Sequence, residues 1–232
     1  MQTIGLIGGM SWESTAEYYR LINERVKERL GGLHSAKIVL YSVDFAEIED
    51  LQQQGDWQQA TELMVDAAQR VRAGGADFVV ICTNTMHRMA DEVERHTSLP
   101  VFHIADATAR AVVAAGVEVV GLLGTRFTME QDFYRGRLAT LHGLEVLVPN
   151  EPDRTFVHDV IYDELCLGVT RDESRRGYLD IIKQLEQRGA EAVILGCTEI
   201  GLLIGPDDTD TLLFDTTGIH AEAAADRAVE SG

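Results

Sequence analysis

Gly75-Ala76-Asp77-Phe78-Val79-Val80-Ile81-Cys82-Thr83 has a counterpart 114 residues later in Gly189-Ala190-Glu191-Ala192-Val193-Ile194-Leu195-Gly196-Cys197. Each stretch begins with Gly, Ala and an acidic residue and continues as an apolar run typical of a buried strand. Each then ends in a side chain that can exchange a proton. The chain is therefore predicted to consist of two similar halves, with Thr83 and Cys197 at equivalent positions.

The repeat extends to the segments on either side. The strand predicted at 4–8 matches one at 120–124, with an offset of 116. Further predicted strands pair 38–43 with 145–148 and 100–104 with 211–215, and predicted helices pair 14–26 with 129–141 and 57–73 with 172–188. Strands rich in Val, Ile and Leu that alternate with amphipathic helices indicate parallel sheets covered on both faces.

Parallel sheets place ligands at the carboxyl ends of their strands. Thr83, Cys197, Gly8-Gly9 and Gly124-Thr125 all fall at such ends. The predicted fold class is thus α/β, with two pseudo-symmetric parallel-sheet domains and the active site in the cleft between them. Two matched side chains, one from each half, indicate an acid–base group on each face of a substrate.

Composition excludes several classes of function. The chain has 232 residues, of which 45% are hydrophobic, and a formal net charge of −18. Such a charge disfavours both nucleic acids and anionic membranes as partners. No apolar run reaches the length of a membrane span, and the start of the chain does not resemble a signal peptide. Three scattered cysteines do not form a disulfide framework, which favours the cytoplasm. The oligomeric state stays open, with a homodimer as one option.

Common cofactor and metal motifs are missing. The Gly5-x-x-Gly8-Gly9 spacing differs from a dinucleotide fingerprint, and no acidic residue ends a second strand about 20 residues on. The turn is better interpreted as one that lets backbone approach a small ligand. The seven histidines show no metal-ligand spacing, and no Ser lies in a G-x-S-x-G turn. No metal and no cofactor is therefore expected.

The cysteines allow two interpretations. A free Cys is most often a buried core residue, and Cys82 and Cys166 are assigned to packing. Cys197 ends a strand and precedes Thr198-Glu199, a placement that favours function. A thiol becomes a useful base or nucleophile when its surroundings favour the thiolate.

In combination, several motifs along the full length resemble the aspartate/glutamate racemase superfamily, the cofactor-independent amino-acid racemases. They are Gly8-Gly9-Met10-Ser11-Trp12-Glu13-Ser14-Thr15, Cys82-Thr83-Asn84-Thr85-Met86-His87, Gly124-Thr125-Arg126, Gly196-Cys197-Thr198-Glu199 and Phe214-Asp215. The resemblance is strongest to the bacterial branch that acts on L-aspartate and L-glutamate or on a broader range of amino acids. It implies one domain at 1–97 plus 210–232 and another at 98–209.

The family's mechanism uses two acid–base groups, usually one cysteine from each half. One group removes the Cα proton from one face of the substrate, and the other returns a proton to the opposite face. Here Thr83 stands where the first cysteine is usual, and Cys197 matches the second. The resemblance implies that Cys197 is the base towards an L-amino acid, with Thr83 as the opposing proton donor.

The same resemblance implies a set of substrate-binding residues. Met10 and the preceding glycines are expected to line one wall, and Gln52 to reach the substrate. The residues next to the catalytic pair are expected to hold the substrate's α-carboxylate and α-amine, namely Asn84, Thr85, Thr198 and Glu199. Arg126 is either a group that offsets substrate charge or an ordinary surface arginine.

Two other functions stay open. Some decarboxylases that resemble this chain keep only the second-half cysteine, which protonates an enediolate after a malonate loses CO₂. The polar pairs at 84–85 and 198–199 disfavour that reaction, because those decarboxylases need an apolar pocket. The other alternative is a catalytically weak amino-acid-binding protein that has lost its first acid–base group.

Overall fold

The structure is a computed structural model that describes residues 1–230. The chain forms two compact units: Met1–Ile104 with the chain from His220 onward, and Ala105–Ile219. The domain boundaries expected from the sequence, at 97/98 and 209/210, lie earlier in the chain than the boundaries between these two units, which follow Ile104 and Ile219. Among the described residues, no helix combines the length and apolar character that a membrane span requires.

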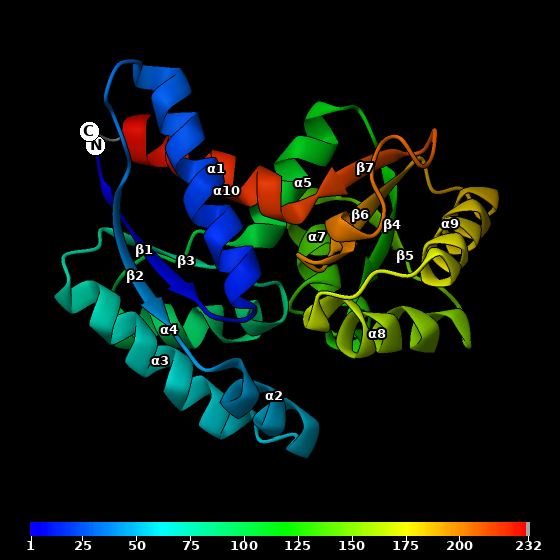
Figure 1. Ribbon diagram of the computed structural model, residues 1–232, viewed down its shortest axis with the longest axis horizontal. Helices are drawn as coiled ribbons and strands as arrows, with labels where there is room; N and C mark the ends of the chain where they lie inside the picture. The colour runs from blue at the N-terminus through cyan, green and yellow to red at the C-terminus, as the bar shows by residue number, and fades with distance from the viewer. Residues whose placement is uncertain (231–232) are drawn as a thin grey trace. The chain divides into compact units, whose positions relative to one another are not determined.

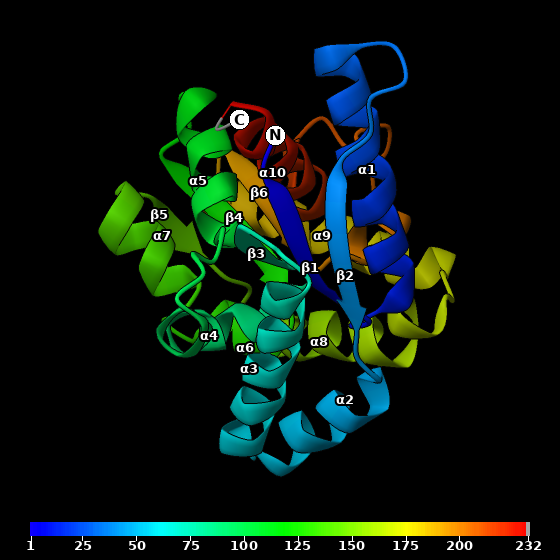
Figure 2. The same cartoon turned by 90° about the vertical axis from the view of Figure 1, so that its left-hand side faces the viewer.

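The first unit is built on a three-stranded parallel sheet with the order β2-β1-β3. Its strands are β1 (Thr3–Gly8), β2 (Lys37–Ser42) and β3 (Phe78–Ile81). Its helical segments are α1 (Trp12–Leu30), α2 (Phe45–Gln54), α3 (Trp57–Ala73), the 3-10 segment η1 (Thr85–Met89), α4 (Ala90–Thr97) and, from His220, the rest of α10 (Thr216–Glu230). Helices α1 and α10 cover one face of this sheet, and α3 and α4 cover the other (Figures 1 and 2).

Strand alternation divides the core of this unit between the two faces. Ile7 and Ile81 belong to the apolar cluster that also holds Met64 and Val71 of α3. On the other face, the Arg227 guanidinium of α10 lies 4.7 Å from the ring centre of Phe78. The sheet is thus buried on both sides, as parallel sheets generally are.

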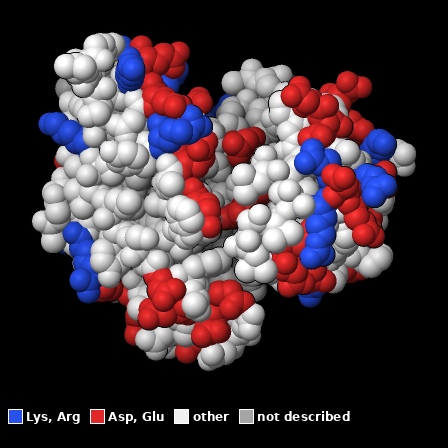
Figure 3. All heavy atoms as spheres, in the orientation of Figure 1, with Lys and Arg blue, Asp and Glu red and all other residues white. Residues whose placement is uncertain are grey.

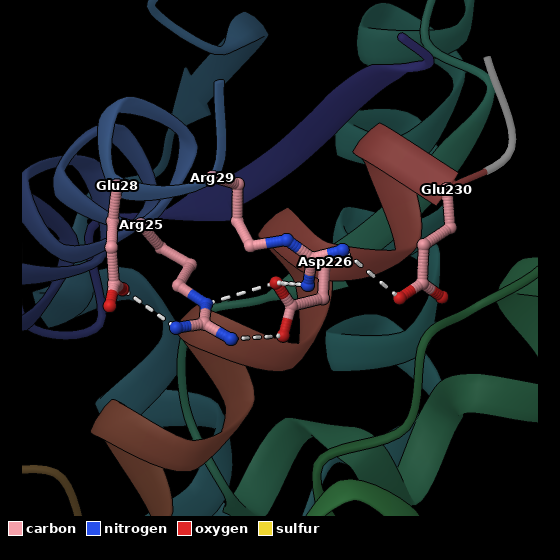
Figure 4. A network of polar contacts seen from close by, with 5 residues as sticks. All are labelled: Arg25, Glu28, Arg29, Asp226 and Glu230. Atoms are coloured by element: carbon pink, nitrogen blue, oxygen red, sulfur yellow. Dashed lines mark hydrogen bonds and ion pairs between the residues drawn. The ribbon is translucent and has the colours of Figure 1, made fainter. Parts of the chain in front are cut away.

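An ion-pair network ties α1 to α10 (Figure 4). Arg25 donates from Nε and Nη2 to the two carboxylate oxygens of Asp226, each over 2.9 Å, and Arg29 Nη1 donates to Asp226 Oδ1 over 2.7 Å. Glu28 and Glu230 lie at the two ends of the network. The paired, two-point geometry fixes the C-terminal helix on α1.

The second unit holds a four-stranded parallel sheet with the order β5-β4-β6-β7. Its strands are β4 (Val119–Gly124), β5 (Glu145–Leu147), β6 (Ala192–Gly196) and β7 (Leu212–Asp215). Its helical segments are α5 (Ile104–Ala114), α6 (Arg126–Glu130), α7 (Arg135–His142), α8 (Asp153–Asp163), η2 (Leu165–Leu167), α9 (Asp172–Gln187) and η3 (Ile200–Leu202). The predicted class, two parallel-sheet α/β domains, is confirmed.

The sequence repeat is also a repeat of strand register. Ile4 pairs with Phe78 in the first sheet, and the corresponding Val120 pairs with Ala192 in the second. Each repeat begins with a Gly-Ala-acid motif, Gly75-Ala76-Asp77 or Gly189-Ala190-Glu191, and the acidic residue explains part of this match. Asp77 Oδ2 accepts a hydrogen bond from the Thr3 amide over 2.6 Å, and Glu191 Oε2 accepts one from the Val119 amide over 3.0 Å. In both units this carboxylate fixes the start of the neighbouring central strand.

Some predicted elements differ from the structure. The strand predicted at 100–104 is wrong: Val101 makes only an isolated bridge to Val79, and α5 already begins at Ile104. Pro100 has no N–H to extend a ladder. The single helix predicted at 129–141 is also wrong, because α6 ends at Glu130 and α7 begins at Arg135. The helices predicted at 57–73 and 172–188 are confirmed within one residue.

Much of the negative charge lies on solvent-facing side chains. On the face drawn in Figure 3, acidic side chains gather over α2, which carries Glu47, Glu49 and Asp50. Burying these carboxylates without a positive partner would cost free energy, so they stay in contact with water. This acidic surface therefore keeps the protein hydrated.

Candidate active site

The turn after β1 is held by its own hydrogen bonds. Thr15 Oγ1 accepts from the Gly9 amide over 2.8 Å and donates to the Ser11 carbonyl over 2.8 Å. Gly9 has a φ of 96°, and a Cβ there would lie 2.2 Å from the Val43 carbonyl oxygen. A glycine is therefore required at this position. Met10, which follows it, is buried. Its predicted place in a wall of the substrate site stays a prediction.

Thr83 follows β3 and is half-buried. Its neighbours Asn84 and Thr85 are buried at the start of η1. The Thr83 carbonyl accepts a hydrogen bond from His87 Nδ1 over 2.8 Å, a contact that the sequence analysis did not predict. The four-residue spacing is the signal that could have found it, since a side chain on a helical turn covers the backbone one turn earlier. Cys82, by contrast, is fully buried in the core, as predicted.

Gln52 lies on α2, a helix that the sequence analysis missed. The side chain is buried, and its Nε2 donates to Met86 Sδ over 3.2 Å. The structure thus brings Gln52 to η1, the segment that begins directly after Thr83 and Asn84. Its predicted contact with a substrate stays a prediction.

In the second unit, two facing glycines let the ends of β4 and β6 approach closely. Gly124 pairs with Gly196, and a Cβ on Gly124 would lie 2.8 Å from the Gly196 carbonyl oxygen. Contacts of that length do not occur at real Cβ atoms, so neither strand end tolerates a side chain here. Cys197 follows at once and is 9% exposed. Thr216 Oγ1, at the start of α10, also donates to the Leu195 carbonyl over 2.8 Å, which fixes this strand end.

Cys197 contacts the carboxylate two residues further on. Its Sγ donates to Glu199 Oε2 over 2.9 Å, and Thr198 Oγ1 donates to the same oxygen over 2.8 Å. Glu199 is 4% exposed, so water contributes little to solvating its carboxylate. The structure therefore brings together the three predicted site residues of this unit. Glu199 as a partner of the thiol, however, was not predicted.

The surroundings of Cys197 favour the thiol over the thiolate. Burial raises its pKa well above the ordinary value, and the negative charges of Glu199 and Cys166 raise the pKa further. The hydrogen bond to Glu199 acts in the same direction, because the thiol and not the thiolate can donate it. Cys166 is half-buried in η2, close enough for its charge to act on Cys197. The Cys197 thiol is therefore protonated at neutral pH.

Arg126 lies at the carboxyl end of β4, at the start of α6. Its Nη2 donates to Thr155 Oγ1 over 2.8 Å, and its Nε lies 4.0 Å from Glu130 Oε1. Its backbone amide donates to His158 Nδ1 over 3.2 Å. Burial and the Arg126 charge lower the pKa of His158. The guanidinium is thus held within the second unit, with part of its charge offset by a neighbouring carboxylate.

The chain's similarity to known proteins covers nearly its whole length. The sequence profile of the Asp/Glu/Hydantoin racemase family matches residues 7–224. The chain belongs to this family.

Two solved structures and one curated protein illustrate the relationship. A Yersinia pestis protein provisionally named an Asp/Glu racemase is 56% identical, with a TM-score of 0.92 over 99% of this chain and 100% of that one. An aspartate racemase homologue from Pyrococcus horikoshii OT3 is 34% identical, with a TM-score of 0.84 over 99% and 100%. The broad specificity amino-acid racemase RacX of Bacillus subtilis (strain 168) is 23% identical over 227 residues, 95% of each chain. The racemase family and these neighbours place the chain among the amino-acid racemases, which are isomerases.

Proposed function

We propose that this racemase acts without pyridoxal phosphate on L-aspartate and L-glutamate, with Cys197 as the base on the L face and Thr83 as the opposing proton donor. The observation that carries the proposal is the buried Cys197–Glu199 hydrogen bond at the carboxyl end of β6. A proton-exchanging side chain at the end of the matched strand β3 supplies the second group. The chemistry requires one bound amino acid to meet both groups.

In the first step, Glu199 takes the thiol proton of Cys197 and becomes a carboxylic acid. The thiolate formed then removes the Cα proton of the L-amino acid, so the sulfur is protonated again and Cα carries the electron pair. Such a carbanion needs hydrogen-bond donors at the substrate carboxylate. Asn84, Thr85 and Thr198, which flank the catalytic pair, are the proposed donors. Glu199 faces the thiol and is also suited to receive the substrate's ammonium group.

In the second step, Thr83 Oγ gives its proton to the other face of Cα, and the D-amino acid is formed. The resulting alkoxide is strongly basic and takes a proton from solvent, while Glu199 gives up to solvent the proton that it took from Cys197. The resting protonation states are then restored before the next turnover. Removal of a Cα proton from a D-amino acid by Thr83 is slow because the alkoxide is scarce at pH 7. The enantiomers have equal free energies, so kcat/KM must be the same in both directions. The threonine therefore makes the enzyme slow, with unequal kcat and KM for the two enantiomers.

Two relatives support acidic amino acids as substrates, since one is named an Asp/Glu racemase and the other an aspartate racemase homologue. The relative named a broad specificity amino-acid racemase supports other amino acids as further substrates. Arg126 is the proposed counter-charge for the side-chain carboxylate, because a protein with a net charge of −18 must offset the charge of an acidic ligand. Met10 and Gln52 form the proposed apolar and polar walls on the side of the first unit.

A chiral assay tests this function. Protein dialysed against hydroxylamine, which removes pyridoxal phosphate, is incubated with each L-amino acid, and the D-enantiomer is quantified. The proposal predicts D-aspartate and D-glutamate, and no loss of rate after dialysis. Failure to form any D-amino acid contradicts it. A disubstituted malonate is assayed in parallel, and CO₂ release from it without racemisation would instead support the decarboxylase alternative.

A further inference from the structure

Three histidine rings pack together inside the first unit, and the mechanism above uses none of them. His87, His103 and His220 are 2%, 6% and 0% exposed. The ring centre of His87 lies 4.6 Å from that of His103 and 5.5 Å from that of His220. Among residues 1–230, no group of three or more His, Cys, Asp and Glu side chains is arranged to hold a metal ion. The cluster therefore calls for another explanation.

The hydrogen bonds of His87 determine where its proton lies. The Thr83 carbonyl oxygen, 2.8 Å from Nδ1, can only accept, so Nδ1 carries the hydrogen. The Ile104 amide donates to Nε2 over 3.2 Å, so Nε2 carries none. His87 is thus a neutral imidazole in its Nδ1–H form. The His87 ring therefore bridges the Thr83 carbonyl and the Ile104 amide through two hydrogen bonds.

His220 fixes the segment to which His87 is anchored. Its Nε2 donates to the Phe102 carbonyl over 2.6 Å, and its Nδ1 accepts from the Tyr18 hydroxyl over 2.8 Å. Val79 adds two backbone hydrogen bonds, from its own amide to Pro100 and from the Phe102 amide to its carbonyl. The segment from Pro100 to Ile104 is therefore held from two sides. Because the Ile104 amide that donates to His87 Nε2 is anchored in this way, the His87 ring can hold the Thr83 carbonyl in one place.

We propose that His87 is a positioning residue for Thr83. The inference rests on the proposed function, in which Thr83 returns the proton. The Thr83 carbonyl and Oγ are attached through the same Cα, so rotation of the peptide group moves the hydroxyl. Misplacement of a reacting group by about 1 Å can reduce a rate by about 10²-fold. The Nδ1–H bond prevents such a rotation.

Two substitutions separate the two hydrogen bonds of His87. His87→Asn places an amide N–H near the position of Nδ1 and retains the donor to Thr83. His87→Gln places an amide oxygen near the position of Nε2 and retains the acceptor for Ile104. Both variants remove the ring, so both lose similar packing. The donor to Thr83 is what distinguishes them.

We expect His87→Asn to retain the kcat for L-to-D conversion within a few-fold and His87→Gln to lose about 10- to 100-fold, with KM little changed in both. Exchange of the L-substrate's Cα hydrogen with D₂O should continue in both variants, because Cys197 performs it. Equal losses of kcat in the two variants, or no loss in His87→Gln, overturn the inference. A wild-type protein that racemises no amino acid overturns the proposed function itself.

A measurement on the wild-type protein stands independently of how well the variants fold. Nitrogen-15 NMR of the histidine side chains distinguishes the two neutral tautomers. The Nδ1–H form of His87 is the expected result. An Nε2–H form, or a charged ring at neutral pH, overturns the inference.

Discussion

Cys197 Sγ donates its hydrogen bond to Glu199 Oε2 over 2.9 Å, and both residues are buried. Burial and, after it, the Glu199 carboxylate raise the pKa of the Cys197 thiol, so the resting enzyme holds Cys197 protonated. A substrate's α-ammonium group brings a positive charge that favours the thiolate. We therefore expect the base to form only when an amino acid is bound, which protects the free enzyme from side reactions of a thiolate.

Replacing Glu199 with Gln should lower the pKa of Cys197 because it removes the negative charge beside the thiol. The rate of Cys197 alkylation by iodoacetamide, which follows the thiolate, should then rise at a lower pH than in the wild type. Racemase activity should fall by at least about 100-fold, since the acceptor of the thiol proton is lost. Mass spectrometry of the Cys197 peptide measures the alkylation.

Cys166 in the same digest serves as the internal control, because it is a second, half-buried thiol of the same protein, on η2. An unchanged or slower alkylation of Cys197 in the Glu199→Gln variant would contradict the assignment of Glu199 as the group that keeps the thiol protonated.

Thr83→Cys should raise the kcat for D-to-L conversion on the order of 10-fold, because a thiolate is far more available than a threonine alkoxide at pH 7. Thr83→Ser retains a hydroxyl and should resemble the wild type. Thr83→Ala should stop inversion while the L-substrate still gains deuterium from D₂O on the face served by Cys197. A chiral assay combined with mass spectrometry measures both outcomes.

The role of Thr83 fails if Thr83→Ala forms D-product at the wild-type rate. It also fails if Thr83→Cys leaves the D-to-L kcat unchanged while the protein remains folded.

Stability should fall as the pH rises above about 9. Burial raises the pKa of the Cys82 thiol above its ordinary value of 9.0. The unfolded chain therefore loses this proton first, so the stabilisation is complete below pH 9 and is lost progressively above it. One such thiol adds a slope of about 1.4 kcal/mol per pH unit. Urea unfolding between pH 8 and about 10.5 measures the slope.

Cys82→Ala supplies the comparison. It should reduce the stability at pH 7 through lost packing, but it should also flatten the slope above pH 9 by about the amount of one thiol. Identical slopes in the two proteins would show that Cys82 is not the group that titrates.

Asp226→Asn should destabilise the protein by about 1 kcal/mol, after allowance for solvent screening of these partly exposed groups. The change removes the charge that Arg25 and Arg29 share. Glu28→Gln is the matched control, because Glu28 contacts Arg25 from an exposed position and should have almost no effect. Equal losses in the two variants would contradict a specific role for Asp226 in holding α10. Urea unfolding at pH 7 measures both.

The apolar strand pattern and the Gly-Ala-acid motif were sufficient to predict the two parallel sheets. The motif marks equivalent strands because its acidic residue has a structural function: Asp77 and Glu191 fix the starts of β1 and β4. Helix α2 was missed, although Asp44 caps its start and Gly55 ends it in a left-handed conformation. Those signals were available. The isolated bridge at Val101 was not predictable, because an apolar segment after a proline is compatible with a full strand.

In the site, the sequence predicted which residues follow the strands, but it did not predict how they pair. Cys197, Thr198 and Glu199 were all named, yet only the fold directs the thiol towards the Glu199 carboxylate. The contact of His87 with the Thr83 carbonyl was missed, although the four-residue spacing between them was an available signal. Hydrogen-bond partners and pKa shifts arise from burial and orientation, which residue order alone does not determine.

The central claim is that Cys197 removes the Cα proton of the L-amino acid. Proton NMR of L-glutamate in D₂O tests it most directly, with wild-type protein compared with Cys197→Ala. We predict loss of the Cα–H signal and formation of deuterated D-glutamate with the wild type, and neither with the variant. Exchange at the wild-type rate in folded Cys197→Ala would contradict the account.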